Sequence, residues 1–174
     1  MKAADLLNIE GYPTDKQAMR LLKEAVKDKK ALNSPSIPSY AIVTPSYEDK
    51  TTNGLTKCVI DFLNSIGCQA ERISSEGKVI DTRQTFTDVT GRCVSVGGVK
   101  RVKSVGQLGT ADISATIHGR SVKIEIKNGI DRQSEVQKEY QKSIESAGGV
   151  YLIVRRFSEF VTWLKHYIET NVKE

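Results

Sequence analysis

The sequence predicts a mixed α/β fold, a small mixed β-sheet with helices on both sides. Apolar residues recur at helical spacing in several stretches, and they alternate with polar residues over about 112–127. They run unbroken at Val150–Val154, a pattern typical of a strand buried on both faces. Helix-like and strand-like patterns therefore alternate along a chain of 174 residues, a length that suits one domain.

Composition excludes several classes of protein. Hydrophobic residues make up 39% and charged residues 27% of the chain, which is ordinary for a globular protein and excludes wholesale disorder. No apolar run approaches the ~20 residues of a membrane span, and the N-terminus does not resemble a secretory signal. The three cysteines form no CxxC pair, which argues against disulfides and zinc knuckles. We therefore expect a cytoplasmic protein without membrane contact, and its net charge of +5 favours a polyanionic partner.

The first part of the chain, residues 1–44, is predicted to be a helical N-terminal extension with a linker. Thr14 and Gln17 form a capping-box pattern, and an apolar stripe at helical spacing follows them. The segment Asn33–Ser39 is rich in proline and serine, as linkers are. The main domain is expected to span residues 45–174.

The main domain is predicted to begin with a helix over 52–66 that ends at Gly67. For residues 74–109, which are rich in glycine, threonine and serine, we expect short strands and loops. Within them, residues 78–103 carry six basic and two acidic side chains, a net charge of +4. The other expected elements are a strand at Gln69–Ile73, a hairpin of Asp112–Ile117 and Val122–Lys127, a helix over about Asp131–Ala147, a strand at Val150–Val154 and a final helix with Ser158 as its N-cap.

The predicted hairpin places two acids opposite each other. A two-residue turn at His118–Gly119, where His118 tolerates a positive φ, sets Asp112 across the ladder from Glu125. Their Cβ atoms would then be about 4.5–5.5 Å apart. Because two like charges in this arrangement destabilise a sheet, a divalent cation is the obvious neutralising partner, and Mg²⁺ prefers such oxygen ligands.

Neighbouring residues extend this candidate site. Lys127 shares a strand face with Glu125, so it could orient an attacking water or stabilise a phosphate, and the Ile126 carbonyl could supply a further metal ligand. A plainer interpretation is an amphipathic strand on which Lys123 and Lys127 neutralise Glu125. A three-residue turn would also put the two acids out of register.

Other candidates have two interpretations each. Gln137 lies ten residues after Lys127 and could support the site, or it could only cap a helix that begins after Ser134. The basic residues Lys100, Arg101 and Lys103 could contact backbone phosphates, or they could be a solvated hairpin tip. Arg132 is a further candidate for binding nucleic acid.

Four of these elements, in this order and at these spacings, resemble the PD-(D/E)xK nuclease superfamily, and most closely its small VRR-NUC type of phages and bacteria. The Gly109-Thr-Ala-Asp112 segment resembles the family's Gly-x-x-Asp strand, and Glu125-Ile-Lys127 resembles its (D/E)xK strand. Gln137 resembles a glutamine that members carry on the next helix, and Gly148–Val154 resembles the core strand that follows.

The resemblance implies a restriction-endonuclease-like sheet flanked by helices and hydrolysis of phosphodiester bonds in DNA, including branched or structured DNA. It also implies a Mg²⁺ or Mn²⁺ cofactor, with Asp112, Glu125, Lys127 and Gln137 as catalytic residues and, by analogy, a homodimer. Family members usually carry an acid on the first helix, where this chain has Gly54. An alternative is therefore a catalytically inactive DNA-binding or assembly module on a nuclease fold. A third is an interaction protein whose N-terminal helices recruit a partner.

Overall fold

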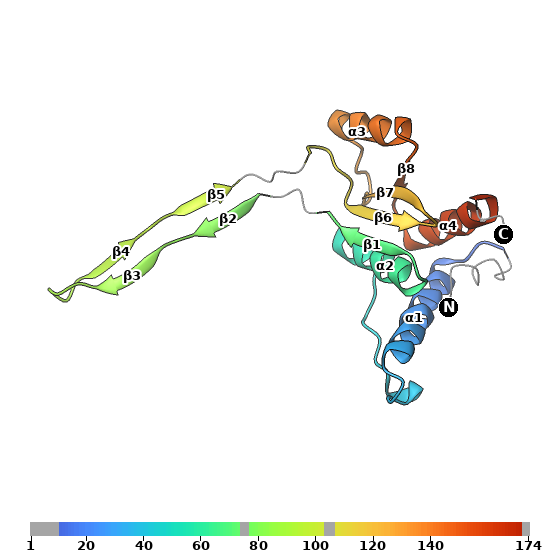
Figure 1. Ribbon diagram of the computed structural model, residues 1–174, viewed down its shortest axis with the longest axis horizontal. Coiled ribbons are helices and arrows are strands. Elements are labelled where there is room, and N and C mark those ends of the chain that lie inside the picture. Colours follow the sequence, from blue (N-terminus) through green and yellow to red (C-terminus); the bar gives the residue numbers. More distant parts are fainter. Residues whose placement is uncertain (1–10, 74–76, 103–106, 172–174) are drawn as a thin grey trace.

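A computed structural model of the protein describes residues 11–73, 77–102 and 107–171 (Figure 1). Its elements, in chain order, are α1 (Asp15–Asn33), the short 3-10 helix η2 (Ser39–Ala41), α2 (Thr52–Ser65), β1 (Gln69–Arg72), β2 (Lys78–Asp81), β3 (Gln84–Thr87), β4 (Cys93–Val96), β5 (Val99–Val102), β6 (Ile113–Ile117), β7 (Arg120–Ile126), α3 (Glu135–Ser146), β8 (Val150–Val154) and α4 (Phe157–Asn171).

The central sheet has four strands in the order β1-β6-β7-β8. Strand β6 is antiparallel to both β1 and β7, whereas β8 runs parallel to β7. A parallel neighbour cannot be reached by a tight turn, and α3 provides the crossover between β7 and β8. The sheet is therefore mixed, and the predicted α/β class is confirmed.

One face of the sheet carries the main hydrophobic core. Helices α2 and α4 pack on this face, and α1 packs against both of them (Figure 1). The helical part of the core includes Leu22 of α1, Phe62 of α2 and Phe160 of α4, all fully buried. The sheet contributes the inward side chains of β6 and β7, such as Ile113 and Ile124.

The opposite face carries α3 alone among the described helices. It packs over β8 and forms a separate small cluster of Ala111, Tyr140, Tyr151 and Ile144. The rings of Tyr140 and Tyr151 meet edge to face with their centroids 6.2 Å apart. Helices thus flank both faces of the sheet, as the alternation of patterns predicted.

Polar caps set where the helices begin. The predicted capping box of Thr14 and Gln17 is present at α1. Helix α3 begins at Glu135 rather than near Asp131, because the Ser134 side chain accepts from the backbone of Gln137 and fixes the first turn there. Ser158 is not an N-cap, since α4 already begins at Phe157.

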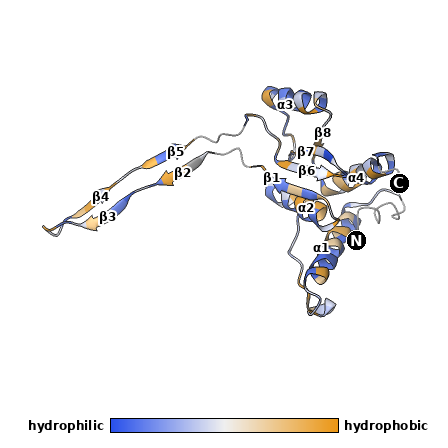
Figure 2. Ribbon diagram, viewed as in Figure 1, coloured by the Kyte–Doolittle hydropathy of each residue, from blue (hydrophilic) through white to orange (hydrophobic). Residues whose placement is uncertain are grey.

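Residues 77–102 depart most from the expectation. Their four short strands pair as β2 with β5 and β3 with β4, and they form an arm that projects from the central sheet (Figure 1). Hydrophobic and hydrophilic residues are interspersed along it (Figure 2). The short strands were predicted, but their assembly into one long ribbon was not.

Strand β8 lies at an edge of the described sheet, next to β7 only. The prediction that Val150–Val154 is buried on both faces is wrong, because Ile153 is 38% exposed. No helix among the described residues is long and apolar enough to cross a membrane.

Candidate functional site

The candidate site is built on the hairpin of β6 and β7. His118 and Gly119 form its two-residue turn with φ values of 46° and 78°, the backbone of a type I′ turn. Ile117 pairs with Arg120, and the ladder continues to the pair of Ile113 and Ile124. The predicted register is therefore confirmed, and Asp112 and Glu125 are opposite one another one step beyond the last ladder pair.

Asp112 lies directly before β6 and reaches across to β7. Its Oδ2 atom accepts a hydrogen bond of 2.8 Å from the backbone N–H of Ile126. This contact holds the half-buried carboxylate beside the backbone that joins Glu125 to Lys127. The carboxylate and the Ile126 peptide thus come from two strands but share one small region.

Glu125 is buried, with only 3% of its surface exposed. Its Oε1 atom lies 3.0 Å from the Lys127 Nζ and also accepts a hydrogen bond from the Gln137 Nε2. Its Oε2 atom accepts a hydrogen bond of 3.4 Å from the hydroxyl of Tyr151. Burial raises the pKa of the Glu125 carboxyl, and the nearby charge of Asp112 raises it further, while the hydrogen bond from Lys127 opposes the shift.

Lys127 brings a positive charge into this buried region. Its side chain is only 10% exposed, and its ammonium group donates to the Gln137 Oε1 at 3.1 Å in addition to pairing with Glu125. A buried ammonium group is tolerated only when such partners replace its water shell. The Lys127 ammonium group is therefore a fixed positive charge between the sheet and α3.

Gln137 caps α3 and also contacts the candidate site. Its Oε1 atom accepts from the backbone N–H of Ser134 at 3.0 Å, which completes the capping box of α3. The same side chain contacts Glu125 and Lys127 through its amide nitrogen and oxygen. One residue thus ties the start of α3 to the charged pair on β7.

Gly109 explains how α3 comes so close to the sheet. Its φ is +77°, and a Cβ atom added there would lie 2.7 Å from the backbone oxygen of Val136 in the first turn of α3. Any side chain at this position would push that turn, and with it Gln137, away from Glu125.

Tyr151 is a site residue that the sequence analysis missed. It donates to Glu125, and burial together with the charge of Glu125 raises the pKa of its phenol. Because it lies in an otherwise apolar stretch, it looked like ordinary core. In the structure it pairs with Lys123 in the parallel register and so lies on the strand face that bears Glu125, a placement that no local sequence pattern specifies.

The basic candidates that the structure describes form no hydrogen bond or ion pair with Asp112 or Glu125. Lys100 and Arg101 are exposed on β5, in the projecting arm, and Lys103 falls outside the described residues. Arg132 is exposed in the loop before α3, five residues after Lys127. The predicted nucleic-acid contacts therefore fall into two separate groups.

The acids in and just before α2 have structural partners of their own. A Cβ atom at Gly54 would lie 2.5 Å from the backbone oxygen of Glu48, so this position has no room for a side chain unless the loop moves. Asp49 accepts from the backbone N–H of Phe157 at 3.2 Å and so caps α4, while Asp61 pairs with Lys57. In the part of the chain that the structure describes, no group of three or more His, Cys, Asp or Glu residues could hold a metal ion.

The donors around Asp112 and Glu125 nevertheless fit a small divalent cation. Mg²⁺ binds proteins through one or two carboxylates and keeps several of its waters, so Asp112 and Glu125 are ligands of the chemical type that it uses. Two residues before Asp112, the buried hydroxyl of Thr110 has no hydrogen-bond partner among the described residues. An unsatisfied polar group at this place is the kind that an ordered water completes.

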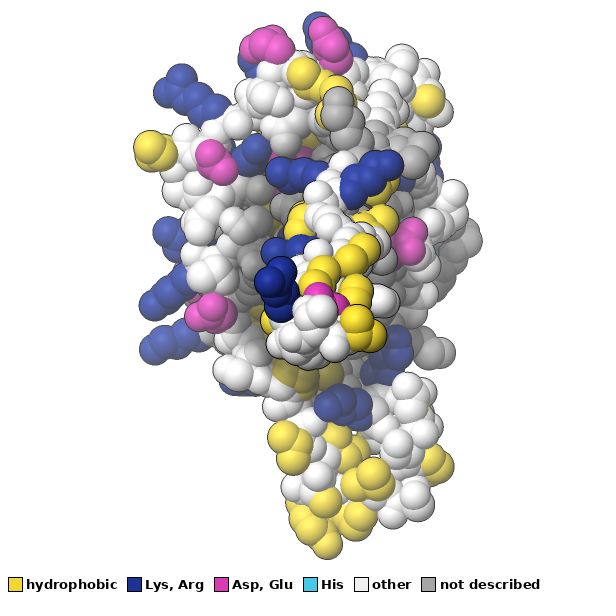
Figure 3. Space-filling view, turned by 90° about the vertical axis from the view of Figure 1, so that its left-hand side faces the viewer, with side chains coloured by type: hydrophobic (Ala, Val, Ile, Leu, Met, Phe, Trp, Pro, Cys, Tyr) yellow, Lys and Arg dark blue, Asp and Glu magenta, His cyan; other side chains and the backbone are white. Residues whose placement is uncertain are grey.

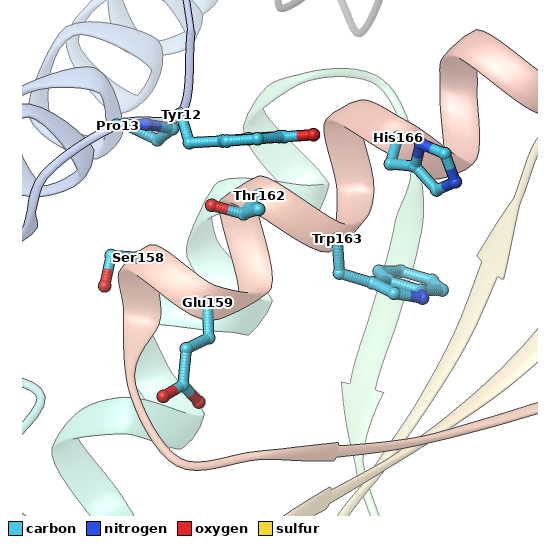
Figure 4. A pocket seen from close by; sticks show the side chains of 7 residues that line it. All are labelled: Tyr12, Pro13, Ser158, Glu159, Thr162, Trp163 and His166. Carbon is cyan, nitrogen blue, oxygen red and sulfur yellow. The ribbon is translucent and has the colours of Figure 1, made fainter.

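Two of the cavities outside this cluster lie near the ends of the sheet and beside α4. One, of about 490 Å³, opens where β7 and β8 end, and its lining includes Asp49, Asn128 and Arg155. The other, of about 470 Å³, lies beside α4, where the ring of Tyr12 extends over the helix near Thr162 (Figure 4). None of the predicted site residues lines either cavity.

A comparison with models of known protein families finds no match to this chain, and a comparison with curated proteins finds none either.

Proposed function

We propose that the protein is a metal-dependent nuclease that hydrolyses phosphodiester bonds in DNA, with Mg²⁺ or Mn²⁺ as its cofactor. The observation that carries the proposal is the convergence of two carboxylates, a buried lysine and a glutamine at one end of β7. This combination supplies ligands for a hard cation and a fixed positive charge for a phosphate, which phosphodiester hydrolysis requires.

In this proposal Asp112, Glu125 and the carbonyl of Ile126 hold the metal ion. A bound Mg²⁺ supplies a water of lowered pKa and positive charge beside a phosphate oxygen. Lys127 stabilises the negative charge that develops on the phosphate or orients the attacking water. Gln137 keeps the Lys127 ammonium and the Glu125 carboxylate in their relative positions through its two hydrogen bonds.

The second candidate function is a DNA-binding or assembly module without catalysis. Two observations favour it. Glu125 already has protein partners on both oxygens. In α2, a side chain at Gly54, where an acid was expected, would collide with the backbone of Glu48. Such a module binds DNA in the presence of EDTA and cleaves none when Mg²⁺ or Mn²⁺ is added.

The deciding experiment is a nuclease assay on linear and branched DNA with Mg²⁺, with Mn²⁺ and with EDTA. We expect cleavage that requires the metal and that falls about 100-fold or more in Asp112→Asn. The fold should survive this change, because an asparagine oxygen can still accept from the Ile126 N–H. The matched control is Asp131→Asn, which removes the same charge from an exposed residue in the nearby loop and should leave cleavage unchanged.

Thermal unfolding of both variants checks that the protein remains intact. Cleavage that survives Asp112→Asn would contradict the nuclease proposal. Metal-independent DNA binding without any cleavage by the wild type would instead favour the inactive module.

A further inference from the structure

The arm of residues 77–102 is one continuous ribbon. Asp81 pairs with Val99, and Gln84 pairs with Val96, so both ladders keep the same alignment. The backbone N–H of Thr82 donates to the Gly98 oxygen at 3.0 Å and bridges the two ladders. The arm therefore extends about ten residues along each strand, or about 35 Å.

The arm exposes apolar side chains along its whole length. Val89 at the tip is fully exposed, and Phe86 is 52% exposed. On the outer ladder Phe86, Val94 and Val96 share one face, opposite Thr85 and Ser95. A two-stranded ribbon is marginally stable by itself, and apolar surface of this kind marks a binding region, so we expect a partner to cover the arm. The other apolar residues that are exposed on its strands are Val79, Ile80, Val99 and Val102.

The charge of the arm identifies the class of partner. Asp81 is neutralised by Arg83, to which it is joined by a salt bridge of 2.6 Å. Arg92, Lys100 and Arg101 are exposed and form no ion pair with any described residue. Viewed towards the tip, basic and hydrophobic side chains lie next to each other on the arm (Figure 3). Asp88, near the tip, offsets one of these charges, and the positive surplus that remains suits a polyanion and disfavours a second arm of the same charge.

We propose that this arm lies in the major groove of duplex DNA that flanks the cleavage site. The groove of B-form DNA is about 12 Å wide and admits a two-stranded ribbon, whereas the major groove of duplex RNA is too narrow. Adjacent residues of a strand point to opposite faces, so Lys100 and Arg101 present positive charge on both faces of the arm to the phosphates that border the groove. An arm of this length occupies about one helical turn, or about 10 base pairs.

The inference rests on the proposed function for the position of the cleavage site, but binding by the arm does not require cleavage. Fluorescence anisotropy in EDTA measures the affinity for a duplex of about 30 base pairs at several salt concentrations. We expect Lys100→Glu/Arg101→Glu to weaken binding about tenfold or more and to lower the salt slope by about two units, since each phosphate contact contributes about 0.9.

The charge-matched control is Lys16→Glu/Lys23→Glu on the exposed side of α1, which should change affinity far less. Equal weakening by both double variants, or none by the arm variant, would overturn the proposal. So would duplex RNA that competes as well as DNA. A fall in molar mass from dimer to monomer on Phe86→Ser, measured without DNA, would assign the arm to a second copy of the chain instead.

The two proposals can fail separately. If Asp112→Asn still cleaves DNA while the arm variant binds it weakly, the nuclease assignment fails and the arm inference stands. If the arm variant binds duplex DNA like the wild type while Asp112→Asn loses cleavage, the arm inference fails and the nuclease assignment stands.

Discussion

At the scale of single residues, Gln137 shows how one side chain can serve both the fold and the site. It caps α3 through its contact with the Ser134 backbone, and it contacts Glu125 and Lys127 on β7. Its two functions can be separated by mutation, because Ser134 takes part only in the cap.

We expect Gln137→Ala to lower both stability and DNA cleavage, whereas Ser134→Ala should lower mainly stability. Each change removes part of a capping box, which costs about 1 kcal/mol. Only the loss of Gln137 removes the side-chain amide that hydrogen-bonds to both Lys127 and Glu125. Urea unfolding and metal-dependent cleavage rates measure the two effects. Equal losses of cleavage in both variants would mean that Gln137 acts through the cap alone.

The thiol of Cys58 leads to a prediction about pH. Burial raises its pKa from 9.0 to about 12, and the charge of Asp49 adds to the shift. Since the unfolded chain loses this proton earlier than the folded protein, stability should fall as pH rises from 9.0 towards 12. Urea unfolding over this range should show a fall that is smaller in Cys58→Ala.

Thiol labelling gives a second readout of the same environment. Near neutral pH a thiol reagent should modify the exposed Cys93 quickly and the buried Cys58 only after unfolding. Rapid labelling of Cys58 in the folded protein would contradict its burial.

The sequence was enough to predict that Asp112 and Glu125 face each other, but it did not predict the contact of Tyr151 with Glu125. The turn at His118–Gly119 and the two-residue period of strands were enough to place Asp112 opposite Glu125. Tyr151 could not be identified in the same way, because its contact depends on a parallel neighbour 26 residues away in the chain. Local patterns do not specify such a pairing.

At the scale of elements, the packing of α3 against the loop before β6 depends on Gly109. A Cβ atom there would collide with the backbone of Val136, and the residue also has a positive φ. The closely matched control is Gly148, which has a φ of +81° but no atom within 4 Å of an added Cβ.

Gly109→Ala should therefore lower stability and DNA cleavage more than Gly148→Ala. Both variants incur backbone strain of about 1 kcal/mol, but only the first displaces the first turn of α3. Melting temperatures and cleavage rates of the two proteins provide the comparison. Indistinguishable behaviour would show that α3 adapts to the added methyl group.

Most elements were predictable because their signals are local. The cap at Thr14 and the apolar stripe after Gly54 predicted α1 and α2 within a few residues. The arm was not predictable as one ribbon, since its inner ladder of β2 and β5 joins residues about 20 positions apart and its side chains show no regular alternation. The start of α3 was placed too early, although Ser134 had been recognised as a cap.

At the scale of the whole molecule, α1 belongs to the same core as the helices that follow it. Leu22 is fully buried among residues of α2 and α4, while Leu32, on the same helix, is 80% exposed. The Pro- and Ser-rich linker suggested an extension, but a linker in the sequence does not reveal how the helix before it packs.

Replacing Leu22 by alanine should lower the free energy of unfolding by about 2–5 kcal/mol, because it leaves a cavity in the main core. Leu32→Ala should change it by less than about 0.5 kcal/mol. Urea unfolding of both variants gives these values. A small effect of Leu22→Ala would mean that α1 detaches readily from the rest of the protein.

The separate cluster beneath α3 has a consequence for the site as a whole. Because α3 packs on a small cluster that is separate from the main core, we expect it to open from the sheet at a lower free energy than α1, α2 and α4. Such an opening would expose the buried charges of Glu125 and Lys127 to water without unfolding the protein. In the proposed nuclease, the metal ion would then reach the acids through a local fluctuation whose free energy is only a fraction of the global stability.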